Sequence, residues 1–364
     1  MWQTTLMSLQ KLRRLLHPMF RSLRFEEVTA MIRNKSFKRI ITGILTSVLI
    51  ALSIIGCGSS SQGGGASTDG SGVKVFFSTL TLDNFKELLM NSVIEAGKNA
   101  GVTVDVGEPC ATVDDQVAQI RDAASKGYDV IICNPVNIDT TLQLEVTAGD
   151  IPILFTNSEP DSAYLKPDKY MYVGSYEIDA GTMQADYVWN KLGKPSSLNV
   201  VLFQGEPTHP AAAKRTKAVK NYFKKAGVNA NFVFNDTAYW DTQKAADEFK
   251  IFLKTGQPYD CVICNNDSMA VGVAQAMKEL GIDTSAIPVV GIDATVEGCQ
   301  SILDGGMQFT VYQSAKGQGA ACIEAAIALA KKGTTKDVQY VTDDLRYVWV
   351  PFEPVDKSNA GSIN

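Results

Sequence analysis

The chain alternates short apolar segments rich in β-branched residues with longer segments in which apolar residues recur at helical spacing. The first series predicts strands at 73–77, 102–106, 130–133 and 153–155, with helices at 85–100, 113–126 and 140–148 between them. The second predicts strands at 199–203, 231–234, 261–264, 289–292 and 309–312, with helices at 210–226, 242–254 and 268–280. Because strands separated by helices pair in parallel, the pattern predicts an α/β protein of two Rossmann-like lobes with right-handed crossovers.

A different pattern precedes these series. The apolar run at 40–55 has the length of a signal-peptide core and is short for a membrane-spanning helix, which needs roughly 20 residues. Basic residues precede it, and Gly56 and Cys57 follow it. We therefore expect 1–56 to be a leader that is cleaved before Cys57, whose sulfur then carries lipid. Met31 offers a more compact start for this leader, and an uncleaved membrane helix is the alternative.

The stretch at 57–72 contains almost only Gly, Ser and small polar residues, so it predicts a flexible tether. Nine of the 34 basic and two of the 39 acidic residues lie in 1–56, so the remainder has a net charge of −12. An acidic protein of this kind is a poor partner for nucleic acid. About 290 residues follow the tether, which is enough for two domains with their own cores.

Six cysteines follow Cys57: Cys110, Cys133, Cys261, Cys264, Cys299 and Cys322. An even number in a secreted protein is compatible with disulfides. However, several of them lie in apolar strand-like runs, so we expect mostly free, buried thiols. The Cys261-x-x-Cys264 pair is a weak metal signal, because a strand places these two side chains on opposite faces.

Polar side chains follow the ends of the predicted strands: Asp83, Asn157, His209, Asn265, Asn266, Asp267 and Asp293. In open parallel sheets the ligand crevice lies outside the carboxyl ends of the strands, so a cleft between the lobes is the expected site. Asp and Asn are also common helix N-caps after such turns, and both interpretations stay open for each residue. Arg215 and Trp240, which lie in or beside the same loops, are not explained by capping.

Several segments resemble the glucose/galactose-binding proteins of the periplasmic sugar-binding family, which also includes the ribose-binding proteins. The segments are LDNF (82–85), FTNSEP (155–160), YVGS (172–175), GEPTHPAAAKRT (205–216), NDTAYWDT (235–242), ICNNDSMAVG (263–272) and VVGIDA (289–294). The resemblance extends from about residue 73 to about residue 357.

This resemblance implies a monomeric, non-catalytic receptor without a cofactor. Such a receptor closes two lobes over one monosaccharide and delivers it to an ABC permease. It implies that the chain crosses between the lobes near 174–175, near Gln313 and again near 347–350. Lobe 1 would then contain 73–174 and about 314–346, and lobe 2 would contain 175–313 and about 347–364.

The resemblance also implies roles for individual residues. Phe85 and Trp240 match the aromatic pair that covers the two faces of the sugar ring, while the positions that hydrogen-bond its hydroxyls are Asp83, Asn157, His209, Arg215, Asn266 and Asp293. Carboxylates, amides and a guanidinium suit a rim of hydroxyls, and aromatic planes suit the apolar C–H faces.

The chain departs from the family pattern at three places. Ala211 stands where the family has an aspartate that accepts from the sugar, and Gln313 stands where it has a sugar-contacting asparagine. A water or a neighbouring residue that replaces the acceptor lost at Ala211, or a different ligand, would account for the first departure. The stretch 190–199 has too few oxygen ligands for the calcium loop that some members carry, so we expect no metal.

Other functions are compatible with parts of the sequence. Asp83 and Asp293 could serve as a glycosidase pair, although nothing assigns a raised pKa to either. Gly317 and Gly319 could suggest a nucleotide loop, but they lie in a helical pattern and favour close helix packing. The leader excludes a sugar-sensing repressor. A chemosensory receptor, or a receptor for a pentose or a furanose signal, is the main alternative.

Overall fold

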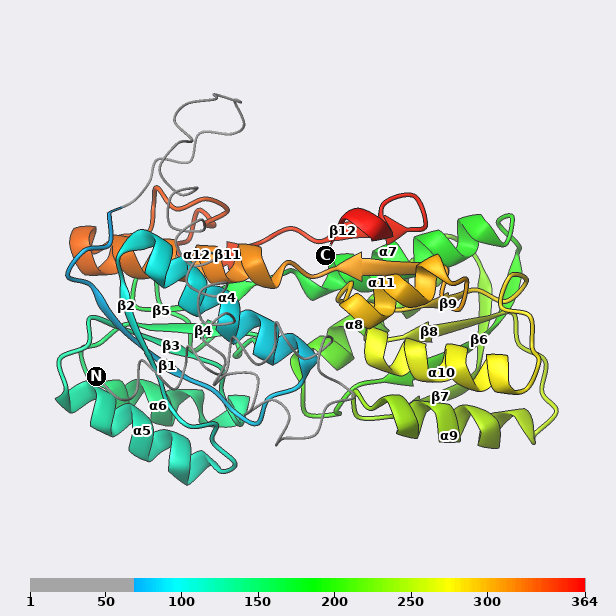
Figure 1. Ribbon diagram of the computed structural model, residues 1–364, viewed down its shortest axis with the longest axis horizontal. Helices are drawn as coiled ribbons and strands as arrows, with labels where there is room; N and C mark the ends of the chain where they lie inside the picture. The colour runs from blue at the N-terminus through cyan, green and yellow to red at the C-terminus, as the bar shows by residue number, and fades with distance from the viewer. Residues whose placement is uncertain (1–68, 364) are drawn as a thin grey trace, which may run out of the picture. The chain divides into compact units, whose positions relative to one another are not determined.

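A computed structural model describes residues 69–363 of the chain and contains the two expected α/β lobes (Figure 1). Lobe 1 has a six-stranded parallel sheet in the order β11-β5-β4-β3-β1-β2. Its strands are β1 (Lys74–Ser78), β2 (Thr103–Val106), β3 (Val130–Cys133), β4 (Ile153–Thr156), β5 (Tyr170–Gly174) and β11 (Tyr347–Trp349). Since β3, β4 and β5 are buried along their whole length, they read as continuous apolar runs.

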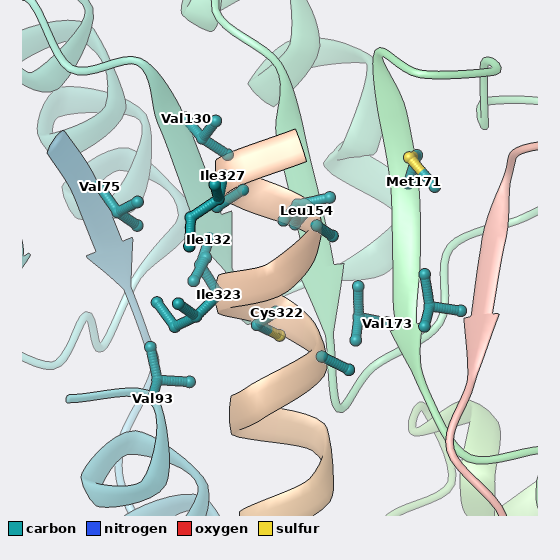
Figure 2. Close-up of a cluster of buried hydrophobic side chains, with 14 of the residues drawn as sticks. Val75, Val93, Val130, Ile132, Leu154, Met171, Val173, Cys322, Ile323 and Ile327 are labelled. Carbon is teal, nitrogen blue, oxygen red and sulfur yellow. The ribbon is translucent and has the colours of Figure 1, made fainter. Parts of the chain in front are cut away.

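Helices cover both faces of this sheet. They are α4 (Asn84–Ala100), α5 (Val113–Ser125), the 3-10 turn η1 (Ile138–Thr140), α6 (Thr141–Ala148) and α12 (Ala315–Lys332). On one face, α4 and α12 pack on the strands, and Figure 2 shows Ile323 and Ile327 of α12 against Ile132 and Leu154. The opposite face packs against α5 and α6. Two helix layers therefore exclude water from the sheet and fix the ends of its strands.

Lobe 2 repeats this architecture around a sheet in the order β12-β10-β9-β8-β6-β7, in which only β12 is antiparallel to its neighbour. Its strands are β6 (Ser197–Gln204), β7 (Asn229–Thr237), β8 (Cys261–Cys264), β9 (Val289–Val290), β10 (Phe309–Tyr312) and β12 (Glu353–Asp356). Its helices are α7 (Glu177–Lys191), α8 (Pro210–Lys225), α9 (Thr242–Leu253), α10 (Asp267–Glu279), α11 (Val296–Leu303) and the 3-10 turn η2 (Ala360–Ser362). One face packs mainly on α7 and α8, and the other on α9, α10 and α11.

The chain passes between the two sheets three times, after β5, after β10 and after β11. The first two crossings lie where the sequence places them. The third, after Trp349, falls within the expected 347–350, and Tyr347, Val348 and Trp349 pair with Tyr172, Val173 and Gly174 of β5. This short strand therefore belongs to lobe 1, and the start of the last segment of lobe 2 moves from about 347 to the residues after Trp349.

The end of the expected tether is also different. Within Asp69–Gly72, Gly70 is buried and its N–H donates to the Ala100 carbonyl at 2.7 Å. A side chain at Gly70 would overlap Val102 and Ala100, so glycine is required by this close contact. Asp69–Gly72 is thus docked on lobe 1, because this backbone donor has a protein partner. The leader, Cys57 and the rest of the tether lie outside the described residues.

Three smaller expectations can be compared with the structure. Gly319 lies within α12, and a Cβ there would come within 2.6 Å of the Ser92 backbone in α4, which confirms close helix packing. The cysteines after Cys57 are all buried, as expected. None of the helices within 69–363 is long and apolar enough to cross a membrane.

Candidate functional site

A cavity of about 70 Å³ lies at the carboxyl ends of the strands, and residues of both lobes line it. Lobe 1 contributes the segment after β1 and the turn after β4. Lobe 2 contributes the turns after β6, β7, β8 and β9, with α7 and α8, and the second crossing contributes one residue. The nine side chains to which the resemblance assigns ligand contact all line this cavity: Asp83, Phe85, Asn157, His209, Arg215, Trp240, Asn266, Asp293 and Gln313. Asn265 and Asp267, which also follow a predicted strand, are fully buried and do not line it.

Three of these residues are also helix N-caps. Asp83 accepts from the Lys86 N–H, His209 Nδ1 accepts from the Ala211 N–H at 3.2 Å, and Asn266 Oδ1 accepts from the Met269 N–H. Capping and cavity lining therefore coexist, so the two interpretations of the sequence were not exclusive. Each cap uses one acceptor and fixes the orientation of its side chain at the rim of the cavity.

The turns that carry the site contain residues with positive φ. Asn157 has φ 61°, Trp240 has φ 64°, and Asp293 has φ 119°. The left-handed region is unfavourable for residues with a Cβ, and such strain concentrates at functional sites. These three of the nine non-glycine residues with positive φ within 69–363 line the cavity, so part of the strained backbone lies at the candidate site.

Arg215 is the centre of the polar contacts and is 4% exposed. Its Nε donates to Glu177 Oε2 at 2.5 Å, one terminal nitrogen donates to the Asn265 carbonyl at 2.7 Å, and the other donates to Gln313 Oε1 at 2.8 Å. The Asp293 carboxylate lies 4.0 Å from the guanidinium. Gln313 thus holds Arg215 and uses its amide oxygen for that purpose.

Two carboxylates, those of Glu177 and Asp293, surround the single positive charge of Arg215. Burial opposes the cation, but Glu177 and Asp293 outweigh it and raise the pKa of Arg215. Burial raises the pKa of Asp293 well above its ordinary value; Arg215 counteracts this, whereas Asp267, Asp83 and Glu177 add to it. Asp293 is therefore a group whose charged form needs a further partner, such as the donor of a ligand.

His209 faces lobe 1 across the cavity. Since Nδ1 accepts from a backbone N–H, the proton of the neutral ring is assigned to Nε2, which lies 3.0 Å from Ser158 Oγ and 3.5 Å from Asn157 Nδ2. Burial, followed by the positive charges of Arg215 and Lys86, lowers the pKa of His209 to about 3. The ring is therefore a neutral hydrogen-bonding group at physiological pH.

We expect His209 to make stability depend on acid pH. Its pKa falls from 6.5 in an unperturbed state to about 3 in the fold, so its contribution is present above pH 6.5 and is lost as pH falls from 6.5 toward 3. The slope approaches about 1.4 kcal/mol per pH unit. Replacing His209 by Asn should remove this dependence of the free energy of unfolding on pH. Urea unfolding of wild type and His209→Asn between pH 4 and pH 8 would measure the difference.

The comparison between the two proteins is necessary because Asp267 acts in the opposite direction. Burial raises the pKa of Asp267 from 3.8 to about 7, so its contribution is lost as pH rises through that range. Asp267 is present in both proteins and cancels in the difference. Parallel stability curves for wild type and His209→Asn would show that the assigned pKa of His209 is wrong.

Aromatic rings from both lobes complete the lining. Phe85 comes from the first turn of α4 in lobe 1, and Trp240 comes from the turn after β7 in lobe 2. The indole packs so closely on Gly205 that a Cβ there would lie 2.0 Å from a ring atom. His209 meets the Trp240 ring edge-on, with centroids 5.4 Å apart. Gly205 and His209 therefore fix the plane of the indole.

The lobes also touch beside the cavity. In addition to the contact between His209 and Ser158, Lys214 of α8 forms an ion pair with Glu159 of lobe 1. Lys214 lies in the first turns of the helix that follows β6, and Glu159 lies in the turn that follows β4. The described conformation therefore already has contacts across the cleft.

Six further lining residues were not selected from the sequence: Leu80, Asn84, Lys86, Glu177, Glu206 and Ser268. Lys86 binds the Asp83 carboxylate at 3.0 Å and the Thr81 carbonyl at 3.0 Å. Glu177 begins the helix after β5, and no strand was predicted at 170–174. Applying the strand-end rule to YVGS would have found Glu177, because it lies three residues beyond that strand.

Residues 74–335 match the family described as periplasmic binding protein domain. This match covers more than half of the chain. The chain belongs to this family. As a periplasmic binding protein it is extracytoplasmic, and like its relatives it is a solute-binding protein and not an enzyme.

Two relatives are similar to this periplasmic binding protein over most of its length. A protein of Rhizobium meliloti named for rhizopine binding is 32% identical over 327 residues, which are 88% of this chain and 97% of the relative. The D-galactose/methyl-galactoside binding periplasmic protein of Haemophilus influenzae is 29% identical over 297 residues, which are 77% of this chain and 88% of the relative.

The periplasmic binding protein fold is confirmed by solved structures. An ABC transporter solute-binding protein of Bacillus halodurans with bound myo-inositol has a TM-score of 0.70 and 26% identity, and the match covers 80% of this chain and 97% of that one. A myo-inositol binding protein of Caulobacter gives 0.68 at 22% identity, with 82% and 97% covered.

Proposed function

We propose that this protein binds a single polyol ring, a hexose of the glucose/galactose type or a cyclitol, between its lobes and delivers it to an ABC permease. The observation that carries this proposal is the convergence of two aromatic rings and a rim of carboxylate, amide, imidazole and guanidinium groups on one cavity. Aromatic faces suit ring C–H groups, and the polar groups suit neighbouring hydroxyls.

The size and the chemistry of the cavity agree with such a ligand. A volume of about 70 Å³ corresponds to about five to seven water-sized positions, which favours one ring over an oligosaccharide. Relatives named for rhizopine and galactose, and a similar structure with bound myo-inositol, support the same ligand class. A ligand that contacts both lobes favours their closed arrangement, which is the form that we expect the permease to recognise.

The test is calorimetric titration of the purified protein with D-glucose, D-galactose, D-allose, D-ribose and myo-inositol. Saturable binding of at least one at micromolar concentration or below is expected, with tryptophan fluorescence reporting the contact of Trp240. Binding of D-ribose with no response to the three hexoses or to myo-inositol would move the specificity to pentoses. No binding of any of the five would contradict the proposal.

We further propose that the protein is held at the membrane by lipid on Cys57. The basic flank, apolar run and cysteine at 33–57 support this proposal. Mass spectrometry of the mature N-terminus should find a diacylglyceryl-modified Cys57, and the Cys57→Ser variant should be released from the membrane. An unmodified mature chain that retains 40–55 would contradict it.

A further inference from the structure

Glu177 has an unused hydrogen-bond acceptor at the candidate site. It is the first residue of α7, it is 2% exposed, and it lines the cavity. Its Oε2 is engaged by Arg215 at 2.5 Å, whereas its Oε1 is buried and has no hydrogen-bond partner among residues 69–363. A buried acceptor without a donor is unfavourable, so Oε1 is suited to receive a donor from a ligand.

The packing of two helices places Glu177 beside Ala211. Helices α7 and α8 run side by side in the same direction: a Cβ at Gly181 would lie 2.3 Å from the Arg215 carbonyl, and Tyr222 donates to Asp186 at 2.5 Å. Glu177 precedes Gly181 by one turn, and Ala211 precedes Arg215 by one turn. The two residues are therefore level with each other on neighbouring helices, and both line the cavity.

Ala211 contributes only a methyl group to this wall. The resemblance to the glucose/galactose-binding proteins implies an accepting carboxylate at this position, which alanine does not provide. A carboxylate from the neighbouring helix reaches the same region, and its bond to Arg215 holds it in one orientation.

We propose that Glu177 is a specificity-determining residue that supplies, from α7, the acceptor that Ala211 does not supply from α8. The inference rests on the proposed function and names the ligand group involved: a hydrogen-bond-donating ring substituent, either a hydroxyl or an ammonium. Glu177 is an acceptor in either case, so both groups fit the same geometry.

A double-mutant cycle tests whether Glu177 replaces the acceptor that is missing at position 211. Wild type, Glu177→Gln, Ala211→Asp and the double variant are titrated calorimetrically with whichever of D-galactose, D-glucose and myo-inositol the wild type binds. In the Gln variant the side chain accepts from Arg215 through its oxygen and turns an N–H donor toward the ligand, so affinity should fall about ten- to hundredfold. Ala211→Asp alone should not raise affinity, whereas in the Gln background it should restore at least tenfold.

A second measurement separates ligand contact from mere positioning of Arg215. Mono-deoxy derivatives of the bound ring are titrated against wild type and Glu177→Gln. One derivative, which lacks the group that faces Glu177, should bind both proteins equally. Amino derivatives distinguish the two donors, since an ammonium opposite Glu177 would bind wild type more tightly than the hydroxyl does.

The outcomes are distinct. Absence of binding to wild type contradicts the proposed function itself. If wild type binds but Glu177→Gln is within twofold of it, or if the loss is the same for every deoxy derivative, Glu177 does not contact the ligand and the inference fails. Asp179→Asn is the matched control, because it removes an exposed carboxylate from the same turn of α7.

Discussion

Replacement of Arg215 by Met is expected to lower the free energy of unfolding by about 3–5 kcal/mol and to abolish ligand binding. The side chain is 4% exposed and donates to Glu177, Asn265 and Gln313. Methionine keeps much of the volume but leaves the carboxylates of Glu177 and Asp293 buried without their cation. Urea unfolding measures the change, with Lys217→Met, an exposed site on the same helix, as the control.

The charge argument has its own test. If uncompensated carboxylate causes the loss, then Arg215→Met combined with Glu177→Gln should be more stable than Arg215→Met alone, because one stranded charge has been removed. An additive double variant would show instead that the loss comes from packing and from the unpaired Asn265 and Gln313 groups.

Replacement of Trp240 by Ala is expected to weaken the binding of every ring that the wild type binds by about ten- to hundredfold, equivalent to about 1–3 kcal/mol. An aromatic face contacts ring C–H groups whatever the configuration of the hydroxyls, so the loss should be general. Calorimetry with the monosaccharide panel measures it. A variant that lost one ring and retained the others would place Trp240 elsewhere than on the ring face.

Two variants accompany this experiment. Gly205→Ala should displace the indole, since the added methyl would overlap it, and should weaken binding without removing any ligand contact. Trp189→Ala removes an indole from α7, outside the lining of the cavity, and should change stability while leaving ligand affinity unchanged.

Three strands with helices on both sides of their sheet were predicted to the residue, whereas β5, which is equally buried, was not predicted. The bounds of Val130–Cys133, Cys261–Cys264 and Phe309–Tyr312 agree with the prediction to the residue. Continuous apolar runs are unambiguous there, because helices cover both sides of the sheet. β11 has three residues and only one of them is buried, so its pattern carried little information, and its pairing with β5 depends on a segment far away in the chain.

The helices that were not predicted have physical reasons as well. α7 buries Glu177 and Gln184 in place of apolar residues, and Gln184 donates to the carbonyls of Cys264 and Gly291. Polar residues with such buried roles interrupt the apolar period that predicts a helix. α11 has eight residues, which is about two turns and too short for a clear period.

The candidate site was largely predictable because parallel strands end at one edge of a sheet. That rule led to Asp83, Asn157, His209, Asn266 and Asp293, with Arg215 and Trp240 in or beside the same loops, and the resemblance added Phe85 and Gln313. The sequence did not predict that Gln313 binds Arg215 rather than lying free in the cavity. Such a contact depends on the meeting of α8 with the second crossing, which no local pattern encodes.

The docking of Asp69–Gly72 has a mechanical consequence. Gly70 is hydrogen-bonded to Ala100, and Lys331 of α12 binds the Asp69 carbonyl, so this segment is fastened to lobe 1 at two points. Any force transmitted along the chain from its N-terminal side is therefore borne by lobe 1, close to the ends of α4 and α12. Lobe 2 is connected to that support through the three crossings and the contacts across the cleft, so such a load reaches it only by way of lobe 1.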